Sequence, residues 1–214
     1  MNRPDPGNYA IKLANPKSLE YQVVRTSLLP GMLKTARENR SLPLPMKIFE
    51  CSDVAVQDSR EERQSRNYRR LCALYMDRKA GFEVAHGLLD RVMQILAIPF
   101  LQTKDSEGEH GYYIAQADGA CRWRVLADPP DPTYLPGRGA TVYYRPRPSV
   151  RASSPTPQPA SSVLDTLASS LKAALPGSRD IVLGSLGILH PTVLSNFELS
   201  RPCSALEIDV EPLL

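Results

Sequence analysis

The hydrophobic positions of the chain predict a few amphipathic helices between short strands. The clearest helix spans residues 82–97, where apolar side chains recur at helical spacing and charged ones mark the other side. Its apolar positions are Ala85, Leu88, Leu89, Val92 and Leu96. Shorter helices are predicted over residues 31–40, which have one apolar face, and over 191–197, which begin with a proline suited to a first helical turn.

Short apolar runs between these helices predict strands. They are expected at residues 23–29, 46–56, 71–76, 112–115, 123–126, 141–145, 181–189 and 205–210, with a weaker edge strand at 8–14. The charged run 57–70 has no periodicity, so we predict a surface loop that joins two antiparallel strands. Antiparallel strands around a few helices indicate an α+β fold.

The composition changes between residues 146 and 180. Five prolines lie between positions 146 and 159, among several serines, and such a segment buries too little apolar surface to offset its chain entropy. A short amphipathic helix is predicted within it, near 163–175. We therefore expect one core domain over residues 1–214, interrupted by a Pro/Ser-rich and partly disordered insert at 146–180.

Composition and charge limit the possible functions. The 214 residues carry a net charge of +3, which does not by itself indicate nucleic-acid binding. The four cysteines lie far apart and the three histidines lack metal-ligand spacing, so reduced thiols and no metal site are expected. No apolar run is long enough to cross a membrane, and we expect a cytoplasmic protein without a membrane partner.

Several motifs, in the same order along the chain, resemble the β subunit of phenylalanyl-tRNA synthetase in its cytosolic eukaryotic and archaeal form. The first covers residues 15–35 and contains Arg-Thr-Ser-Leu-Leu-Pro-Gly. The others are Phe-Glu-Cys-Ser-Asp at 49–53, Gly-Phe-Glu-Val-Ala-His-Gly-Leu-Leu-Asp-Arg-Val-Met at 81–93, Pro-Gly-Arg at 136–138, Leu-Gly-Ile-Leu-His-Pro at 186–191 and Leu-Glu-Ile-Asp-Val-Glu-Pro-Leu-Leu at 206–214. Their number and order make the resemblance specific.

The resemblance implies the catalytic-like domain of that subunit. Its fold would be that of a class II aminoacyl-tRNA synthetase, an antiparallel sheet flanked by helices. In the family this domain assembles with the catalytic α subunit, as α2β2, into the ligase that joins phenylalanine to its tRNA. ATP and magnesium would then be bound by the α subunit, with no cofactor in this chain.

The first motif is the candidate subunit interface, because class II synthetases form interfaces through that motif. The candidate interface residues are Arg25, Thr26, Leu28, Leu29, Pro30, Gly31, Met32 and Leu33. Leu28, Leu29 and Leu33 are equally suited to filling the core of the domain itself. The sequence leaves both alternatives open.

The residues that adenylation needs are not evident. ATP phosphates require fixed arginines, which class II enzymes carry on a strand of the second motif and at a helix start after a glycine-rich strand. The strand expected at 46–56 contains no arginine, and Arg138, between two glycines, is followed by a predicted strand. We therefore predict no catalytic residue here and no activity of this chain alone.

The alternative function is RNA binding through the basic run 57–70. Its possible RNA contacts are Arg60, Arg63, Arg66, Arg69 and Arg70. Three acidic residues are interleaved with them and Tyr68 is the only aromatic residue of the run, so a solvated loop fits the same pattern. A binding titration at several salt concentrations separates the two, because phosphate contacts give a steep salt slope.

Overall fold

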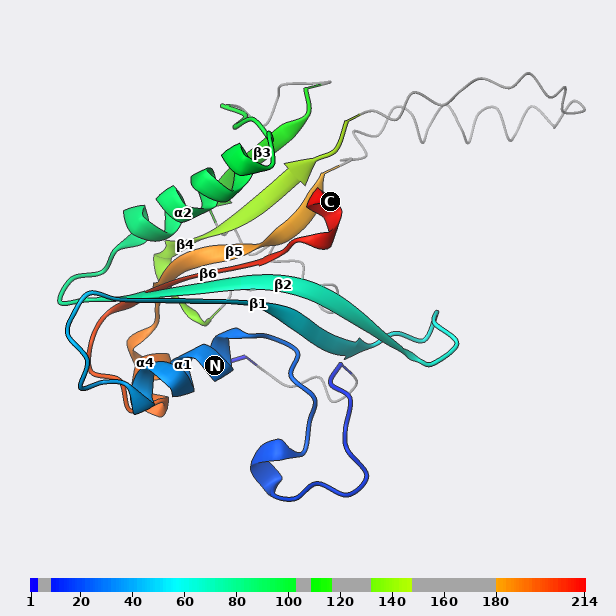
Figure 1. The fold of residues 1–214 in the computed structure, drawn as a ribbon, viewed down its shortest axis with the longest axis vertical. Coiled ribbons are helices and arrows are strands. Elements are labelled where there is room, and N and C mark those ends of the chain that lie inside the picture. Colours follow the sequence, from blue (N-terminus) through cyan, green and yellow to red (C-terminus); the bar gives the residue numbers. More distant parts are fainter. Residues whose placement is uncertain (4–8, 103–108, 117–131, 148–179) are drawn as a thin grey trace, which may run out of the picture.

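A computed structural model describes residues 1–3, 9–102, 109–116, 132–147 and 180–214 of the chain (Figure 1). The longer elements are α1 (Leu29–Glu38), β1 (Met46–Gln57), β2 (Ser65–Met76), α2 (Phe82–Ile95), β3 (Gly111–Gln116), β4 (Tyr134–Arg145), β5 (Ile181–Leu189), α4 (Pro191–Asn196) and β6 (Cys203–Asp209). Two short 3-10 turns are η1 (Leu19–Tyr21) and η2 (Glu211–Leu213). The strand predicted at 123–126, the helix predicted at 163–175 and nearly all of the insert predicted at 146–180 lie outside the described residues.

The strands form one six-stranded sheet in the order β1-β2-β6-β5-β4-β3, in which every neighbouring pair is antiparallel. The longest pairing joins β1 and β2, from Met46 opposite Met76 to Gln57 opposite Ser65. Because successive side chains of a strand point to opposite faces, each strand contributes to two layers of packing. The predicted α+β architecture, an antiparallel sheet flanked by helices, is confirmed.

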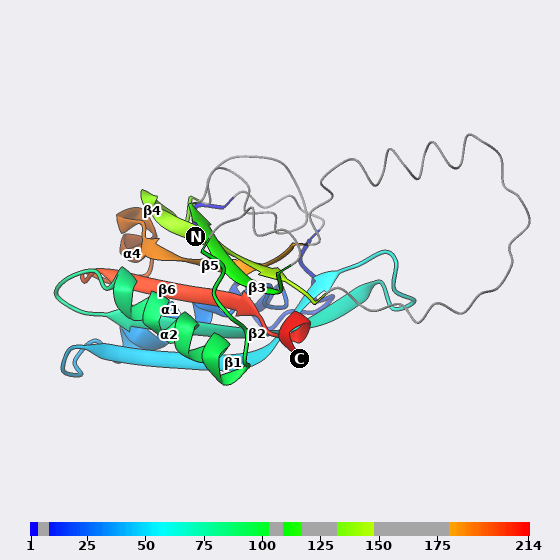
Figure 2. The same ribbon diagram turned by 90° about the horizontal axis from the view of Figure 1, so that it is seen from above.

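Helices cover both faces of the sheet (Figures 1 and 2). On one face, α1 and α4 pack with the residues of β2 and β6 that include Cys72, Leu74 and Ala205. On the opposite face, α2 packs with the alternate residues of the same strands, including Ala73 and Leu206. The sheet therefore separates two apolar cores.

Helix α1 begins earlier than the sequence predicts. It starts at Leu29, and Pro30 lies in its first turn, where the missing proline N–H breaks no helical hydrogen bond. The strand predicted at 23–29 is wrong, because this segment makes only an isolated bridge between Val23 and Lys12. Within residues 9–14, the described part of the edge strand predicted at 8–14, the same bridge is the only β-pairing.

The predicted surface loop at 57–70 is also wrong. Only residues 58–64 form the turn, which the hydrogen bond from Asp58 N to Gln64 O closes at 3.0 Å. Strand β2 begins at Ser65, and its charged first half pairs residue by residue with the end of β1. Cross-strand pairing overrides the lack of hydrophobic periodicity, because these charged residues pair with an end of β1 in which Val54 and Val56 are buried.

Other predicted elements agree closely with the structure. Strand β5 has the predicted bounds 181–189, and β6 and α4 differ from their predictions by only a few residues. Helix α2 ends at Ile95, two residues before its predicted end. No helix of the described part of the chain is long and apolar enough to span a membrane.

Candidate functional site

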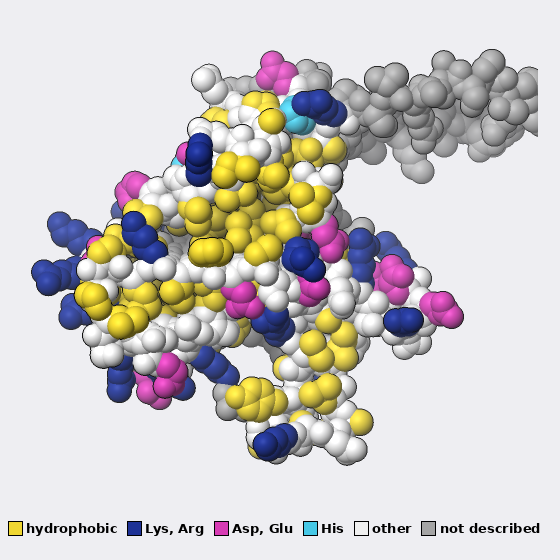
Figure 3. All heavy atoms as spheres, in the orientation of Figure 1, with side chains coloured by type: hydrophobic (Ala, Val, Ile, Leu, Met, Phe, Trp, Pro, Cys, Tyr) yellow, Lys and Arg dark blue, Asp and Glu magenta, His cyan; other side chains and the backbone are white. Residues whose placement is uncertain are grey.

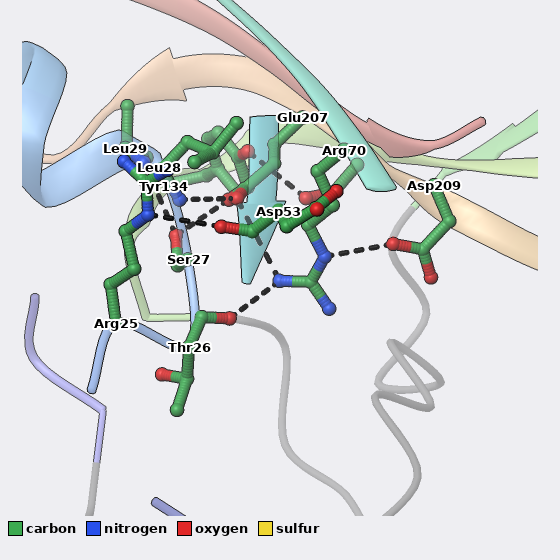
Figure 4. Close-up of polar contacts among 11 residues, drawn as sticks. Arg25, Thr26, Ser27, Leu28, Leu29, Asp53, Arg70, Tyr134, Glu207 and Asp209 are labelled. Carbon is green, nitrogen blue, oxygen red and sulfur yellow. Dashed lines mark hydrogen bonds and ion pairs between the residues drawn. The ribbon is translucent and has the colours of Figure 1, made fainter. Parts of the chain in front are cut away.

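A buried polar cluster ties the first motif to the sheet (Figure 4). The carboxylate of Glu207, on β6, accepts hydrogen bonds from the Leu28 backbone N–H at 2.8 Å and from the Ser27 hydroxyl at 2.7 Å. The side chain of Glu207 is 3% exposed. The amide of Leu28, at the entry to α1, is thereby satisfied by a charged acceptor from the other end of the chain.

Arg70, on β2, completes this cluster. Its Nε donates to Asp209 Oδ1 at 2.8 Å, and its Nη1 donates to the carbonyl oxygen of Thr26 at 2.6 Å. The same Nη1 lies 3.7 Å from Glu207 Oε1. One arginine and two carboxylates therefore bind the backbone of residues 26–28 against β2 and β6.

The electrostatics of the cluster are those of a structural site. Burial opposes the charge of Arg70, but the carboxylates of Glu207 and Asp209 outweigh this and raise the pKa of the guanidinium. Burial also raises the pKa of Asp209, an effect that Arg70 only partly offsets. Removing one partner of such a buried ion pair typically costs about 3–5 kcal/mol, because a buried charge is left uncompensated.

Arg25 fixes the same segment to the outer strand of the sheet. Its guanidinium donates to Glu50 Oε1 at 2.7 Å, to Ser52 Oγ at 2.5 Å and to the carbonyl oxygen of Asp53 at 3.0 Å. A backbone hydrogen bond adds to these contacts, since Ala55 N donates to the carbonyl oxygen of Arg25 at 3.1 Å. Arg25 thus covers part of the outer edge of β1, and Tyr9 covers another part, since its carbonyl oxygen accepts from Gln57 N at 3.0 Å.

The apolar residues predicted at a subunit interface lie in the core instead. Leu28, Leu29, Met32 and Leu33 are at most 3% exposed and pack within the core shared by α1, α4 and the sheet. The structure therefore favours the core alternative for these four side chains, and the interface assignment for them is wrong. Arg25, Thr26, Pro30 and Gly31 are partly or fully exposed, and their interface role stays a prediction.

The five arginines predicted to contact RNA do not form one surface. Arg70 is 4% exposed, so that prediction is wrong for it. Arg69 forms an ion pair with Asp53 across the strands, and Arg66 lies over the Tyr68 ring at 4.9 Å. Arg60 and Arg63 are exposed in the turn 58–64, and an RNA contact by them stays a prediction.

An arm at the N-terminal side, formed by two hydrogen-bonded chain segments within residues 9–24, exposes apolar side chains. Leu13 N donates to Gln22 O and Val24 N donates to Ile11 O, both at 2.9 Å, which holds the arm together. The exposed apolar residues of the arm are Leu13, Leu19, Tyr21 and Val23. The arm projects from the body in Figure 1. It is the part of the first motif region that offers apolar surface to a partner.

The structure brings together no group of metal ligands within the described residues. His86 contacts Asp90 one helical turn away at 3.1 Å, and His190 caps α4 by accepting from Thr192 N at 3.1 Å. Cys72 and Cys203 are buried, whereas Cys51 is exposed. An open surface hollow is lined by Arg37, Glu38, Arg40 and Glu198, whose charges pair in part with one another.

Sequence comparisons identify the same family along almost the whole chain. The profile of the "Phenylalanyl tRNA synthetase beta chain CLM domain" matches residues 1–210. The phenylalanine--tRNA ligase beta subunit of Drosophila melanogaster is 42% identical over 205 residues, which cover 96% of this chain and 26% of that protein. The Schizosaccharomyces pombe beta subunit is 44% identical over 202 residues, covering 94% of the chain and 27% of its own length.

A cytoplasmic beta subunit of Arabidopsis thaliana is 34% identical over 218 residues. This chain thus spans about a quarter of the length of its curated relatives. Among solved structures, the pyrrolysyl-tRNA synthetase of Desulfitobacterium hafniense superposes with a TM-score of 0.51 at 14% identity, covering 96% of this chain and 52% of that one. That likeness concerns the fold alone, a class II synthetase-like fold.

Proposed function

The chain belongs to the family of the phenylalanyl tRNA synthetase beta chain CLM domain, and from this premise we propose that it is a non-catalytic assembly domain. In this proposal it pairs with the catalytic α subunit of a phenylalanine–tRNA ligase, in an α2β2 complex. The chain contributes scaffold and contact surface, while the α subunit performs the reaction.

The buried cluster around Arg70 carries the proposal. An adenylating enzyme needs arginines that are free to meet phosphate oxygens. Here the buried guanidinium is bound by Asp209, Glu207 and the Thr26 carbonyl, so it is committed to holding residues 26–28 on the sheet. β1 has no arginine, and its hairpin partner β2 has three, of which Arg69 and Arg70 are ion-paired.

This proposal also assigns the cofactors and substrates to the other components of the complex. ATP, magnesium and phenylalanine would bind to the α subunit, and tRNA would be held by the complex. A cytoplasmic location is part of the proposal, supported by the name of the plant relative. The exposed arm residues and Arg25, Thr26, Pro30 and Gly31 remain available for contact with a partner.

An ATP–pyrophosphate exchange assay tests the absence of chemistry. We expect the purified chain to give no phenylalanine-dependent exchange, whereas the α subunit purified together with the chain gives exchange. Phenylalanine-dependent exchange by the chain alone would overturn the non-catalytic part of the proposal. Failure of the two proteins to co-purify would overturn the assembly part.

A further inference from the structure

Helix α2 carries more apolar surface than its packing against the sheet uses. Its buried side chains are Ala85, Leu89 and Met93. A second apolar stripe on the same helix is solvent-exposed and consists of Val84 at 40%, Leu88 at 38% and Ile95 at 69% exposure. A helix that is apolar on two sides is normally packed on two sides.

The second stripe of α2 points toward β2 and β1. Asp90, on the other flank of the helix, accepts a hydrogen bond from the Tyr112 hydroxyl of β3 at 2.6 Å. At the start of α2, Gly81 touches the ring of Tyr75 on β2. Helical geometry therefore places Leu88 and Ile95 on the flank away from β3, above the β1–β2 side of the sheet.

The sheet presents matching apolar residues there. Phe49 of β1 is 76% exposed, and Leu71 of β2 packs only partly against the core beneath α2. Strand alternation puts Phe49 on the same face as Leu71, the partner of Cys51. We call the residues Phe49, Leu71, Val84, Leu88 and Ile95 the α2 flank patch. Figure 3 shows apolar side chains gathered in a band beside α2 and over the neighbouring strands.

The width of the sheet explains why this surface is open. Six strands spaced about 4.8 Å apart make a face roughly 24 Å wide, whereas one helix is only about 10 Å across. Among the described helices, α1 and α4 share one face, whereas α2 shares the other only with the short turn η2, whose Leu213 packs against the same core. The uncovered strip over β1 and β2 is wide enough for a second helix packed against α2.

We propose that the α2 flank patch is the docking surface for an amphipathic helix of the α subunit, with apolar residues on one side and carboxylates at its edge. This rests on the proposed function and assigns it a specific surface. Lys47 lies at the β1 edge of the patch over the Tyr75 ring, and Arg91 lies on the outer side of α2. Within the described residues neither cation has a carboxylate in ion-pair contact, so an acidic partner edge would complement both.

The same charges argue against a second copy of this chain as the occupant. A two-fold contact through the patch brings identical surfaces together. It would add the cations of one copy to those of the other, because Lys47 and Arg91 both border the patch. Like charges at a contact edge disfavour it. A different polypeptide with an acidic flank has no such cost.

Two substitutions that each introduce a carboxylate test the proposal. Ile95→Glu places a carboxylate in the patch, and Ser195→Glu places the same charge on exposed α4, which packs on the opposite face of the sheet. Each variant is co-expressed with the α subunit, and the affinity of the complex is measured alongside the thermal midpoint of the chain. We expect Ile95→Glu to bind at least about tenfold more weakly, equivalent to about 1.4 kcal/mol, and Ser195→Glu to bind like the unchanged chain.

Cys51 gives a second, independent readout because its exposed thiol is on the face of the patch. Cys72 and Cys203 are buried, so replacing Cys121 by serine makes the labelling specific to Cys51. In this Cys121→Ser background, the α subunit should slow thiol labelling of Cys51, and Ile95→Glu should restore fast labelling. If the unchanged chain binds the α subunit while Ile95→Glu and Leu88→Glu bind equally well, the patch assignment is overturned and the proposed function stands. If these variants lose only self-association and keep their affinity for the α subunit, the patch binds a second copy of the chain, and the patch assignment is also overturned. No binding by the unchanged chain overturns the proposed function.

Discussion

Glu207 holds the amide of Leu28 at 2.8 Å, although the two residues are 179 positions apart in the sequence. This contact sets the position of helix α1, because it fixes the residue from which the helix starts. The next residue, Leu29, is fully buried beneath the helix. The last strand of the sheet, β6, therefore holds the first motif in place.

Leu29→Asp should unfold the domain. Leu29 is 0% exposed, and burying an unpaired carboxylate there costs several kcal/mol, so we expect a loss of roughly 4 kcal/mol or failure to accumulate as soluble protein. Gly31→Asp is the matched control, since a side chain at Gly31 meets nothing within 4 Å. Thermal melts of both variants check this. A Leu29→Asp domain as stable as the control would contradict the core assignment.

Glu207→Gln should weaken the anchor of residues 26–28. The neutral amide keeps the shape of the side chain but removes the charge that compensates Arg70, so we expect the free energy of unfolding to fall by about 2–4 kcal/mol. Urea denaturation measures this loss. Glu62→Gln, in the exposed turn, is the control and should change stability by less than about 0.5 kcal/mol. Equal stability of the two variants would mean that the cluster does not anchor the motif.

Stability should fall at alkaline pH. Burial raises the pKa of Cys203 to about 12 and raises that of Cys72 well above its usual value. Both thiols stay protonated in the folded chain, while in the unfolded chain they ionise near about 8.5. As the pH rises, the unfolded chain therefore loses these protons before the folded chain does. The free energy of unfolding is unaffected below the thiol pKa of the unfolded chain and declines above it, by up to about 1.4 kcal/mol per pH unit for each thiol.

Thermal melts between pH 8 and pH 11 test this decline, with Cys203→Ala as the comparison. The variant should lose stability less steeply with rising pH, because one titrating group has been removed. Identical pH slopes for the two proteins would show that the Cys203 thiol is not shielded from water in the folded chain.

The RNA hypothesis now makes a narrow prediction. Of the five candidates, Arg69 and Arg70 are ion-paired and Arg66 lies over the Tyr68 ring, whereas Arg60 and Arg63 are exposed. Direct tRNA binding by the chain should therefore involve about two phosphate contacts. The slope of log affinity against log salt should then be about −2 or shallower. A filter-binding titration measures it, and Arg60→Ala with Arg63→Ala should flatten the slope further. A slope of about −5 would revive a broad RNA-binding surface.

The sequence predicts the apolar elements well and the polar site poorly, for one physical reason. Elements such as β5 and α2 bury a periodic set of side chains, and periodicity is visible along the chain. Arg70 lies in a run of charges that resembles a solvated loop, and its burial depends on Asp209, 139 positions away. No local pattern contains that information, although two acidic residues within the apolar final strand are a signal that buried charges need partners.

The role of the first motif illustrates the same limit. Its leucines suit a core and an interface equally well, and only the sheet beneath α1 decides between them. The apolar surface that remains for a partner lies away from these leucines, on the arm and beside α2. The surface beside α2 could not be recognised from the sequence, because helical spacing groups Leu88 with buried residues although its side chain is 38% exposed.

The most direct test of the account is the assembly itself. The chain and the α subunit, purified separately and mixed, should form a defined complex by size-exclusion chromatography with light scattering. Phenylalanine-dependent ATP–pyrophosphate exchange should appear only in fractions that contain the α subunit. Separate elution of the two proteins, or exchange in fractions that contain only this chain, would contradict the assignment of a non-catalytic assembly domain.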